Sequence, residues 1–504
     1  MTGLAPGVTF APYLGDPPLE ACYMARHTSS MTNSMNQGDT AMDGQTIDAL
    51  RASVAGEVLG PGDARYDDAR AVWNAMIDRR PSVIIRATQT ADVVTAVTFA
   101  QAHGLAVSIR GGAHNVAGHA VGDDGVMIDL SAMRGVRVDP QRRRAWVEGG
   151  ATWGDVDAAT QVFGLATPGG LISETGVGGL TLSGGIGWLR SAYGLCIDNL
   201  VSADVVTADG RLVHADQDEH ADLLWALKGG GGNFGVVTTF EFALHPVGPT
   251  VYFAGPVYPI EVGAGPIRFW REFLADKNDR VGSLIEFSTI PSDPAYPESA
   301  WGKRVFTVAA VFAGDADEGE ALLQPLRELG EMVTDFSGQM DYCAIQQLFD
   351  TVIPFGQHRC YWKSQYLGGL TDEVIDLILE QNASPASPNT LSSIWNFGGA
   401  TAAVGTADTA FGDRSMPYMV SIDSIWNAPE DDAANMAWTR DFWDRLSPYS
   451  SQGRIYLNFA GLGEGNEDLV RRSFGRNFER LVTIKRTYDP DNAFRFNQNI
   501  RPAI

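Results

Sequence analysis

The chain has 504 residues, of which 44% are hydrophobic and 19% are charged, a composition typical of a folded protein rather than a disordered one. This length exceeds what one hydrophobic core supports, so we expect two or three domains. The formal net charge of -24 at pH 7 argues against nucleic acid or an anionic membrane as a partner, because both repel an acidic surface.

Cysteine usage and hydropathy restrict the class further. Cys22, Cys196, Cys343 and Cys360 are too few and too scattered for a disulfide framework or a zinc site. No apolar run has the length of a membrane span, and the N-terminus lacks the basic flank and apolar core of a secretory signal. We therefore expect a cytoplasmic protein without a metal site, whose oligomeric state the composition leaves open.

Residues 1–45 are rich in Met, Gly, Pro, Ser and Thr and have no sustained period. This indicates a flexible N-terminal arm, or translation begun upstream of the functional start. Periodic structure begins near residues 46–50, where a Thr or Asp could cap a short helix.

From Pro81 to about Pro246 short strands alternate with helices. Hydrophobic spacing predicts strands over 82–85, 106–109, 126–130, 144–148 and 236–242, and helices over 90–103, from Thr152 and over 222–227. Gly104 is typical of a helix stop, and Asp209-Gly210 within 203–213 indicates a hairpin. The pattern predicts an α+β domain of small mixed sheets.

Beyond Gly248 the strands and helices follow a different pattern. The predicted elements are strands over 251–257, 305–311 and 418–425, and amphipathic helices over 316–330 and 371–382. They indicate a second domain, an antiparallel sheet backed by helices. A last helix over 467–485 is expected to lead into a turn at 488–492 and a strand-like tail over 494–499.

The stretch Arg110-Gly111-Gly112-Ala113-His114-Asn115 follows a predicted strand, a common place for ligand contacts. Its glycines let backbone amides approach a phosphate, and its histidine is placed to touch a cofactor. Taken alone, a glycine turn with a satisfied histidine is the commoner structure.

Two more glycine-rich stretches follow. Residues 176–187 offer several N–H donors as a nest for anions, or form a tight loop between packed elements. Thr181 stands where the third glycine of the Rossmann fingerprint belongs. Residues 230–235 have the G-x-G-x-x-G spelling but follow a helix and precede a strand, the reverse of the required order. A flavin loop or a plain turn remains there.

In their order, these motifs resemble those of flavoproteins like berberine bridge enzyme, in the vanillyl-alcohol-oxidase superfamily. The resemblance covers residues 110–115, 176–187, 194–200, 229–235, 361–364, 456–459, 488–490 and 497–499, and so runs roughly from 81 to 500. It implies an α+β fold with a PCMH-type FAD-binding domain of two small α+β subdomains over 46–247, its core at about 77–247. A substrate-binding domain over 248–460 and a C-terminal segment over 461–504 that returns to the FAD domain complete it.

The resemblance also implies FAD bonded to His114 through the flavin 8α-methyl group; a neutral imidazole is a suitable nucleophile. The implied cofactor-binding residues are Ile109, Arg110, Gly111, Gly112, Ala113, His114, Asn115, Thr175, Gly176, Gly179, Ser183, Gly187, Gly235, Val236, Val237, Asn497 and Asn499. His119 is expected to make a structural hydrogen bond. Ile172 replaces a cysteine that forms a second flavin bond in many relatives, so one link is expected. Cys196 is interpreted as a buried small hydrophobe.

For catalysis the resemblance implies Tyr456 as the base. Its pKa, near ~10 in the free residue, would have to be lowered by a cation or a hydrogen-bond donor. Lys363 could be that cation, could neutralise reduced flavin, or could be solvated or ion-paired. Asn427 lies near a position where some relatives carry a carboxylate base. Phe459, Trp395 and Trp426 could form cavity walls or core.

The expected activity is an FAD-dependent oxidase that removes hydride from a hydroxyl-bearing carbon of a sugar, alcohol or secondary metabolite. Dioxygen would accept the electrons and give hydrogen peroxide. Thr175, a modest side chain where the family controls oxygen access, favours an oxidase. A dehydrogenase with another acceptor and a flavin carrier without turnover are the alternatives. A hydrolase is not indicated, because Gly-x-Ser-x-Gly and His-Glu-x-x-His are absent from the sequence.

Overall fold

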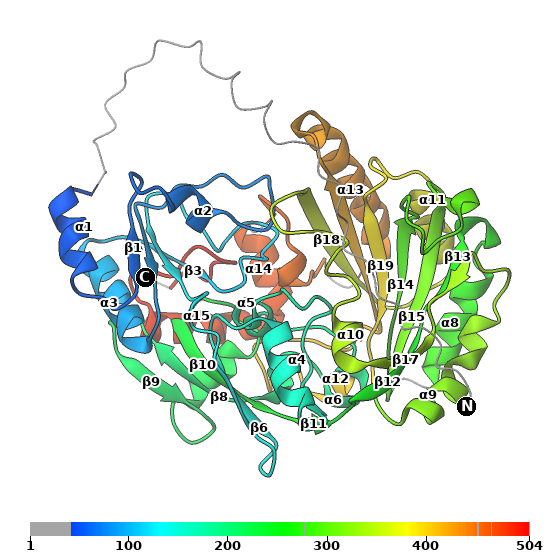
Figure 1. Ribbon diagram of the computed structural model, residues 1–504, viewed down its shortest axis with the longest axis horizontal. Helices are drawn as coiled ribbons and strands as arrows, with labels where there is room; N and C mark the ends of the chain where they lie inside the picture. The colour runs from blue at the N-terminus through cyan, green and yellow to red at the C-terminus, as the bar shows by residue number, and fades with distance from the viewer. Residues whose placement is uncertain (1–41, 277–278, 451–452, 465, 503–504) are drawn as a thin grey trace, which may run out of the picture. The chain divides into compact units, whose positions relative to one another are not determined.

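The computed structural model describes residues 42–276, 279–450, 453–464 and 466–502, which belong to one compact unit (Figure 1). The arm expected over 1–45 lies outside the described residues, apart from its last four. Helix α1 (Gly44–Arg51) begins at that point, and the Asp43 carboxylate caps it by accepting the Thr46 N–H. Among the described residues, no helix is long and apolar enough to cross a membrane, and no group of three or more metal-ligating side chains occurs.

The first sheet has four strands in the order β1-β2-β4-β3. Their bounds are β1 (Glu57–Leu59), β2 (Val83–Arg86), β3 (Val107–Arg110) and β4 (Val126–Asp129). β4 runs parallel to β2 and β3, so β2 and β3 need a crossover, which α3 (Thr90–Ala102) supplies. Gly104, with φ of 65°, follows the end of α3 as predicted. α2 (Tyr66–Arg70) precedes β2.

The second sheet has five antiparallel strands in the order β5-β6-β10-β8-β9. Their bounds are β5 (Val136–Asp139), β6 (Arg144–Glu148), β8 (Leu200–Val206), β9 (Leu212–Ala215) and β10 (Val236–Ala243). Asp209-Gly210 joins β8 to β9, which confirms the predicted hairpin. Helices α4 (Trp153–Gln161), α5 (Val177–Leu182), α6 (Arg190–Tyr193) and α7 (Ala221–Leu227) connect the strands; a two-stranded ribbon pairs β7 (Leu165–Ala166) with β11 (His245–Pro246).

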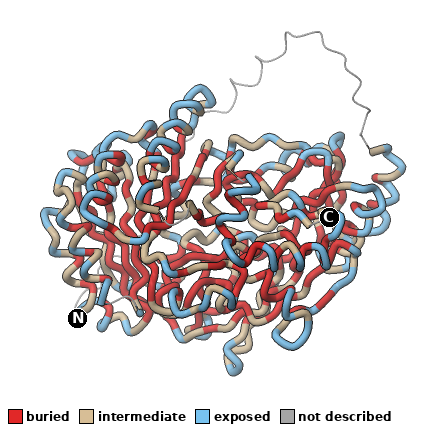
Figure 2. The backbone as a smooth tube through the Cα atoms, turned by 180° about the vertical axis from the view of Figure 1, so that it is seen from behind, coloured by how far each residue is buried: buried red, intermediate tan, exposed pale blue. Residues whose placement is uncertain are grey.

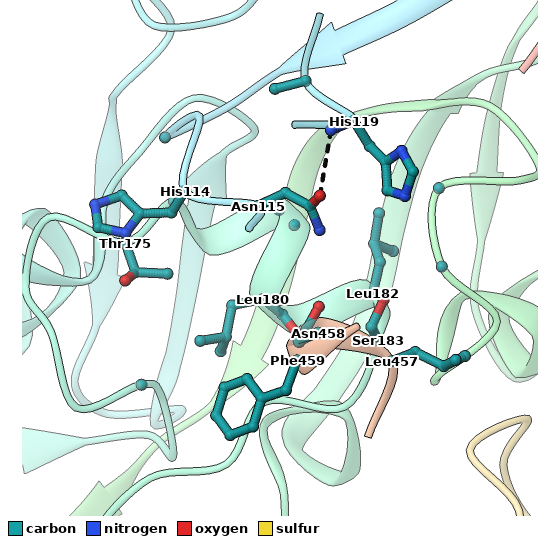
Figure 3. A pocket seen from close by; sticks show the side chains of 18 of the residues that line it. His114, Asn115, His119, Thr175, Leu180, Leu182, Ser183, Leu457, Asn458 and Phe459 are labelled. Carbon is teal, nitrogen blue, oxygen red and sulfur yellow. Dashed lines mark hydrogen bonds between the residues drawn. The ribbon is translucent and has the colours of Figure 1, made fainter. Parts of the chain in front are cut away.

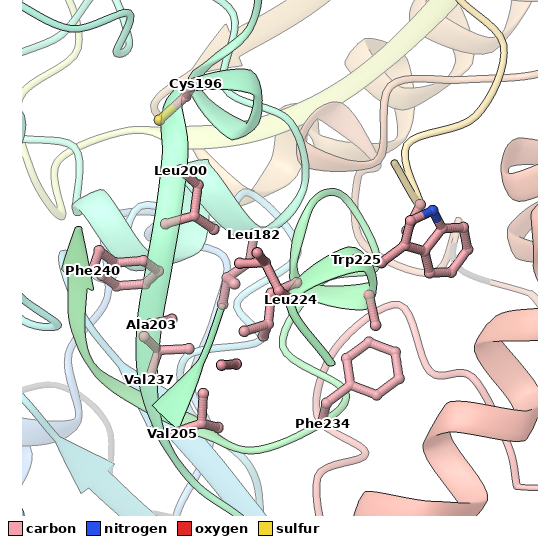
Figure 4. Close-up of a cluster of buried hydrophobic side chains, with 14 of the residues drawn as sticks. Leu182, Cys196, Leu200, Ala203, Val205, Leu224, Trp225, Phe234, Val237 and Phe240 are labelled. Carbon is pink, nitrogen blue, oxygen red and sulfur yellow. The ribbon is translucent and has the colours of Figure 1, made fainter. Parts of the chain in front are cut away.

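A hydrophobic core under the second sheet is shared by the sheet (Figure 4) and the C-terminal segment of the chain. Leu200, Val237 and Phe240 of the sheet pack with Cys196, as the sequence predicts for that cysteine. The C-terminal helices α14 (Glu467–Phe474) and α15 (Phe478–Tyr488) contribute to the same core. The single helix predicted over 467–485 is therefore wrong: Gly475, with φ of 54°, separates two helices.

The tail over 494–499 is not a strand, contrary to the prediction. The backbone N–H groups of Ala493 and Phe494 donate to the Asp489 carboxylate at 2.8 and 2.9 Å, and the Phe494 carbonyl accepts from Lys485 Nζ at 2.9 Å. Side chains thus satisfy backbone groups that a strand would offer to a ladder.

The third sheet has nine antiparallel strands, with the central order β16-β13-β15-β14-β19-β20-β18. Their bounds are β12 (Thr250–Ala254), β13 (Pro256–Pro259), β14 (Val281–Thr289), β15 (Arg304–Phe312), β16 (Thr334–Asp335), β17 (Gly338–Asp341), β18 (Arg359–Leu367), β19 (Leu391–Asn396) and β20 (Tyr418–Trp426). The strand expected over 251–257 is divided between β12 and β13.

Helices cover one face of the nine-stranded sheet (Figure 1). They are α8 (Gly265–Ala275), α11 (Asp372–Ala383), α13 (Asp432–Leu446) and the shorter α9 (Ala316–Leu323). The short helix α10 (Tyr342–Gln346) packs against the opposite face, and α12 (Ala400–Ala403) packs against α6. The helix expected over 316–330 ends at Leu323, followed by a 3-10 turn that contains Pro325. Figure 2 shows the sheet strands mostly buried and the outer helices partly exposed. The α+β fold is therefore confirmed.

Candidate active site

A cavity of about 310 Å³ lies between the glycine-rich loops, whose lining residues Figure 3 shows, and the face of the nine-stranded sheet opposite α8, α11 and α13. His114, Thr175 and Ser183 line it from the loops. Trp362, Trp395 and Asp423 line it from the sheet, and Tyr456 and Phe459 from the segment before α14. It therefore gathers residues from the first, middle and last parts of the chain.

His114 faces this cavity from a strained turn, because Ala113 before it has φ of 56°. Its ring stacks on the Trp73 indole with centroids 5.3 Å apart. Nε2 is buried and has no hydrogen-bond partner among the described residues. Burial lowers the pKa of His114 to about 4, so the imidazole is neutral at pH 7.

Two glycine loops touch each other at the cavity wall. A Cβ added to Gly112 would lie 2.3 Å from the Gly176 nitrogen, and a Cβ added to Gly176 would lie 2.2 Å from the Gly112 nitrogen. Gly179, by contrast, has nothing within 4 Å of such a Cβ in the described part of the chain. Glycine is thus needed where the loops meet, and Gly179 leaves the backbone open to the cavity.

The structure brings most of the predicted cofactor residues together. Those that line the cavity are Ile109, Gly112, Ala113, His114, Asn115, Thr175, Gly176, Gly179, Ser183, Gly235, Val237 and Asn497. Five others lie outside its lining: Arg110, Gly111, Gly187, Val236 and Asn499.

Their contacts explain two of these exceptions. The Arg110 guanidinium donates to the carbonyl oxygens of Ala69 and Ala71, and lies 3.8 Å from the Asp129 carboxylate. The Val236 side chain points into the core beneath the first sheet, because neighbouring side chains alternate along a strand.

Gly187 has a structural partner instead of a cavity contact. Its carbonyl accepts from the fully buried Arg190 at 2.9 Å, and the same guanidinium donates to the Asn396 carbonyl at 2.9 Å. Arg190 thereby joins the glycine loop to the nine-stranded sheet. Burial lowers the pKa of this guanidinium to about 9.

His119 also lines the cavity, which corrects the structural role expected of its side chain. Its backbone N–H donates to Asn115 Oδ1 at 3.2 Å (Figure 3, dashed line). Its ring atom Nε2 is buried without a partner within the described residues. Burial lowers the pKa of His119 to about 4.

Tyr456 is 2% exposed, and its hydroxyl oxygen accepts two hydrogen bonds. The Asn458 side chain donates at 2.8 Å and the Gly185 N–H donates at 3.1 Å. Burial nevertheless raises the pKa of Tyr456 to about 12, so the expected lowering of this pKa is wrong for the free protein. With its oxygen accepting twice, Tyr456 has its own proton left to donate.

Lys363 lies outside this cavity, so it is not the cation expected beside Tyr456. It pairs in register with Ile422 of β20, whereas its neighbour Trp362 pairs with Asp423. Adjacent residues of a strand face opposite sides, so Trp362 lines the cavity and Lys363 lies on the other face. Its Nζ bonds Glu464 Oε2 at 2.5 Å.

Two carboxylates in the cavity were missed by the sequence analysis. Ser421 Oγ donates to Asp423 Oδ2 at 2.9 Å, and Ser393 Oγ donates weakly to Glu286 Oε2 at 3.5 Å. Burial raises the pKa of Glu286 to about 7 and that of Asp423 to about 8, and the charge of Glu286 raises the Asp423 value further. Single acidic residues inside otherwise apolar strands were the signal for this pair.

Only some of the residues predicted to form the cavity walls line the cavity. Trp395 and Phe459 line the cavity, but Trp426 does not, and its Nε1 donates to Asp432 at 2.8 Å. Asn427 is exposed and bonds His358 at 2.6 Å, so it is not a cavity residue either. Phe349, Phe496 and Gln498 line the cavity without having been predicted.

Comparisons with known proteins agree with this geometry. Residues 81–216 match the family described as FAD binding domain, and residues 455–501 match the family described as berberine and berberine like. The FAD-linked oxidoreductase YgaK of Bacillus subtilis (strain 168) is 30% identical over 464 residues, which cover 90% of this chain and 98% of the relative.

A second relative, (R)-6-hydroxynicotine oxidase of Paenarthrobacter nicotinovorans, is 28% identical over 90% of this chain and 98% of its own length. The solved structure of 6-hydroxy-D-nicotine oxidase from Arthrobacter nicotinovorans aligns with a TM-score of 0.79 and 27% identity, covering 90% of this chain and 99% of that one. The chain belongs to the berberine-bridge-enzyme-like family of FAD-linked oxidoreductases.

The residues present fit an FAD. The touching glycine loops and the open Gly179 offer backbone to a phosphate-bearing ligand, and His114, whose Nε2 has no partner among the described residues, lines the cavity beside them. The loops would therefore hold the cofactor, and the sheet face would hold the substrate.

Proposed function

We propose that this protein is an FAD-dependent oxidase that takes a hydride from a carbon next to a hydroxyl or amine group of a small organic substrate. One observation carries the proposal. The glycine loops and His114 line one side of the cavity. Tyr456 and a sheet face that carries aromatic and acidic side chains line the same cavity. A cofactor on the loops and a substrate on the sheet would therefore meet within reach of each other.

His114 is the proposed single covalent anchor of the FAD. Its imidazole is buried and neutral, and the neutral form is the nucleophile. Ile172 lines the cavity, and no cysteine is among the described residues that line it. Cys196 packs in the hydrophobic core, where burial raises the pKa of its thiol, so it supplies no second anchor.

FAD, when bound, accepts the hydride and passes the electrons to dioxygen, which gives hydrogen peroxide. The protein's own groups orient the substrate and hold its proton. Tyr456 donates its hydroxyl proton toward the cavity, since Asn458 and Gly185 occupy its oxygen. Asp423 in its ionised form accepts the proton that leaves the substrate heteroatom, because a pKa raised to about 8 makes this carboxylate a stronger base than a free one.

Dioxygen as the acceptor is supported by two observations. Thr175, a modest side chain at the position that the resemblance assigns to oxygen access, lines the cavity. Relatives with matching length include proteins named oxidases, among them (R)-6-hydroxynicotine oxidase.

The test is a panel of amines, alcohols and saccharides mixed anaerobically with the purified holoenzyme while the flavin absorbance is followed. We expect at least one compound to bleach the flavin, and air then to restore the colour with one hydrogen peroxide formed per flavin. Recovery with a quinone but not with air would identify a dehydrogenase. Absence of bleaching by the whole panel would contradict turnover.

A further inference from the structure

Glu286 and Asp423 come from two strands that β19 separates, and they face the same side of the sheet. Glu286 of β14 pairs with Ser393 of β19, and Asp423 of β20 pairs with Leu391 of β19. Directly paired residues share a face, as do residues two apart on one strand, so both carboxylates lie on the face that lines the cavity.

No cation among the residues that the structure describes compensates this pair. Burial raises the pKa of both carboxyl groups, and one serine hydroxyl lowers each of them. The charge of Glu286 also raises the pKa of Asp423. No lysine, arginine or histidine is among the groups that shift these values in the described part of the chain. Asp423 is 9% exposed, and its Oδ1 has no hydrogen-bond partner among the residues that the structure describes. With Asp423 buried and Glu286 partly buried, ionisation of the two carboxyl groups is costly unless a ligand supplies a counter-charge.

Aromatic side chains stand beside the carboxylates. Trp362 pairs in register with Asp423, and its indole meets the Phe459 ring edge-on at 5.5 Å. Trp395 lies 6.2 Å from the same phenyl ring. The faces of such rings attract cations, most strongly where water is excluded.

We propose that the substrate carries a protonated amine, and that its ammonium group binds between Glu286 and Asp423 against Trp362 and Phe459. This inference rests on the proposed function and narrows its substrate class to amines. When the ammonium enters, the carboxylates ionise and release their protons to solvent, while the N–H bonds of the ammonium stay intact. The formal charge of -24 also draws cations toward the protein.

A neutral hydroxyl substrate would meet this face less well. It would supply no counter-charge for either carboxylate, so the two groups would keep their raised pKa values, and Leu391 and Ile353 in the cavity lining offer no side-chain partner for further hydroxyls. The carboxylate pair, the unpartnered Oδ1 of Asp423 and the aromatic wall each favour a cation. A cation is therefore the ligand that fits all three features.

The experiment measures equilibrium binding to the purified holoenzyme by calorimetry. Benzyltrimethylammonium is the probe, because it cannot lose a proton or be oxidised, and benzyl alcohol is the neutral comparator. The variants are Asp423→Asn and Glu286→Gln, which keep the side-chain shapes. Asp157→Asn is the control, because Asp157 is another buried carboxylate with a pKa raised to about 7, bonded to Gln346 away from the cavity.

We expect the cation to bind at pH 8 at least about tenfold more tightly than the alcohol, and each cavity variant to weaken the cation by about tenfold or more. Alcohol affinity should change less than about threefold, and Asp157→Asn should leave both ligands unchanged. Equal affinity for alcohol and cation, or cavity variants that bind the cation like the wild type, would overturn the proposal. Because no turnover is needed, cation binding without bleaching by any amine would contradict the oxidase and leave the cation site standing.

Discussion

The indole of Trp73 lies 5.3 Å from the imidazole of His114, centroid to centroid, with an angle of 23° between the ring planes. Trp73 is 1% exposed, and its Nε1 donates to the Ile353 carbonyl at 3.1 Å. A large ring fixed in this way restricts the rotation of the imidazole. Trp73 is therefore a positioning residue for the proposed flavin anchor.

Substitution of this indole should slow formation of the flavin bond. We expect Trp73→Ala to lower the rate of covalent FAD incorporation by about 10- to 100-fold, because a misplaced nucleophile loses proximity, and Trp73→Phe to retain most of it. The measurement follows protein-bound flavin after acid precipitation at successive times of incubation with FAD. Equal rates in Trp73→Ala and wild type, at equal total FAD binding, would argue against positioning.

Removal of the Tyr456 hydroxyl should affect turnover more than substrate binding. The hydroxyl is the proposed donor to the reacting group, and loss of one such donor lowers kcat by roughly 10²-fold. We expect this loss in Tyr456→Phe with little change in flavin content. Tyr366→Phe is the matched control, since that hydroxyl is buried without a partner in the described residues and lies outside the cavity lining. A kcat equal in both variants would refute the role of Tyr456.

The C-terminal segment should depend on one buried ion pair. Lys485 and Asp489 are both fully buried 2.6 Å apart, and Lys485 also bonds the Asn233 carbonyl at 2.8 Å. Lys485→Met leaves the carboxylate without its cation, a loss of about 3–5 kcal/mol in the free energy of unfolding. Thermal unfolding measured by circular dichroism should therefore begin at a lower temperature. An unchanged Tm would mean that the pair contributes nothing net.

Cation binding should depend on pH with a definite sign. In the free protein the pKa of Glu286 is raised to about 7 and that of Asp423 to about 8, so both carry protons in acid. A cation binds the ionised forms, so the affinity of benzyltrimethylammonium should rise from pH 6 to pH 9 and then level off. Tyr296 and Cys360 lie near the pair, but their raised pKa values keep them neutral in this range. Calorimetry at four pH values measures the curve, and a flat or falling affinity would contradict it.

The elements that follow local patterns were predictable from the sequence. The β8–β9 hairpin carries Asp-Gly at its turn, and α4 begins at Thr152 with a capping box to Asp155. The glycine loops around His114 were predictable as tight turns from their composition, and the order of the motifs along the chain was what favoured a cofactor there.

The sheet side of the site could not be predicted in the same way. Glu286 and Asp423 are far apart in the chain, and only the β14-β19-β20 order brings them to one face. Alternation along a strand shows that the side chains of Trp362 and Lys363 must face opposite sides of the sheet. Which of the two faces the cavity depends on which side of the sheet the helices cover. The raised pKa of Tyr456 likewise follows from burial by distant segments.

The most direct test of the central claim is acid denaturation of the purified protein, with flavin absorbance measured in the pellet and in the supernatant. For the wild type we predict that the yellow colour stays in the pellet, and for His114→Ala that it moves to the supernatant or is absent. Colour released from the wild type, or retained in the pellet of His114→Ala, would contradict the account.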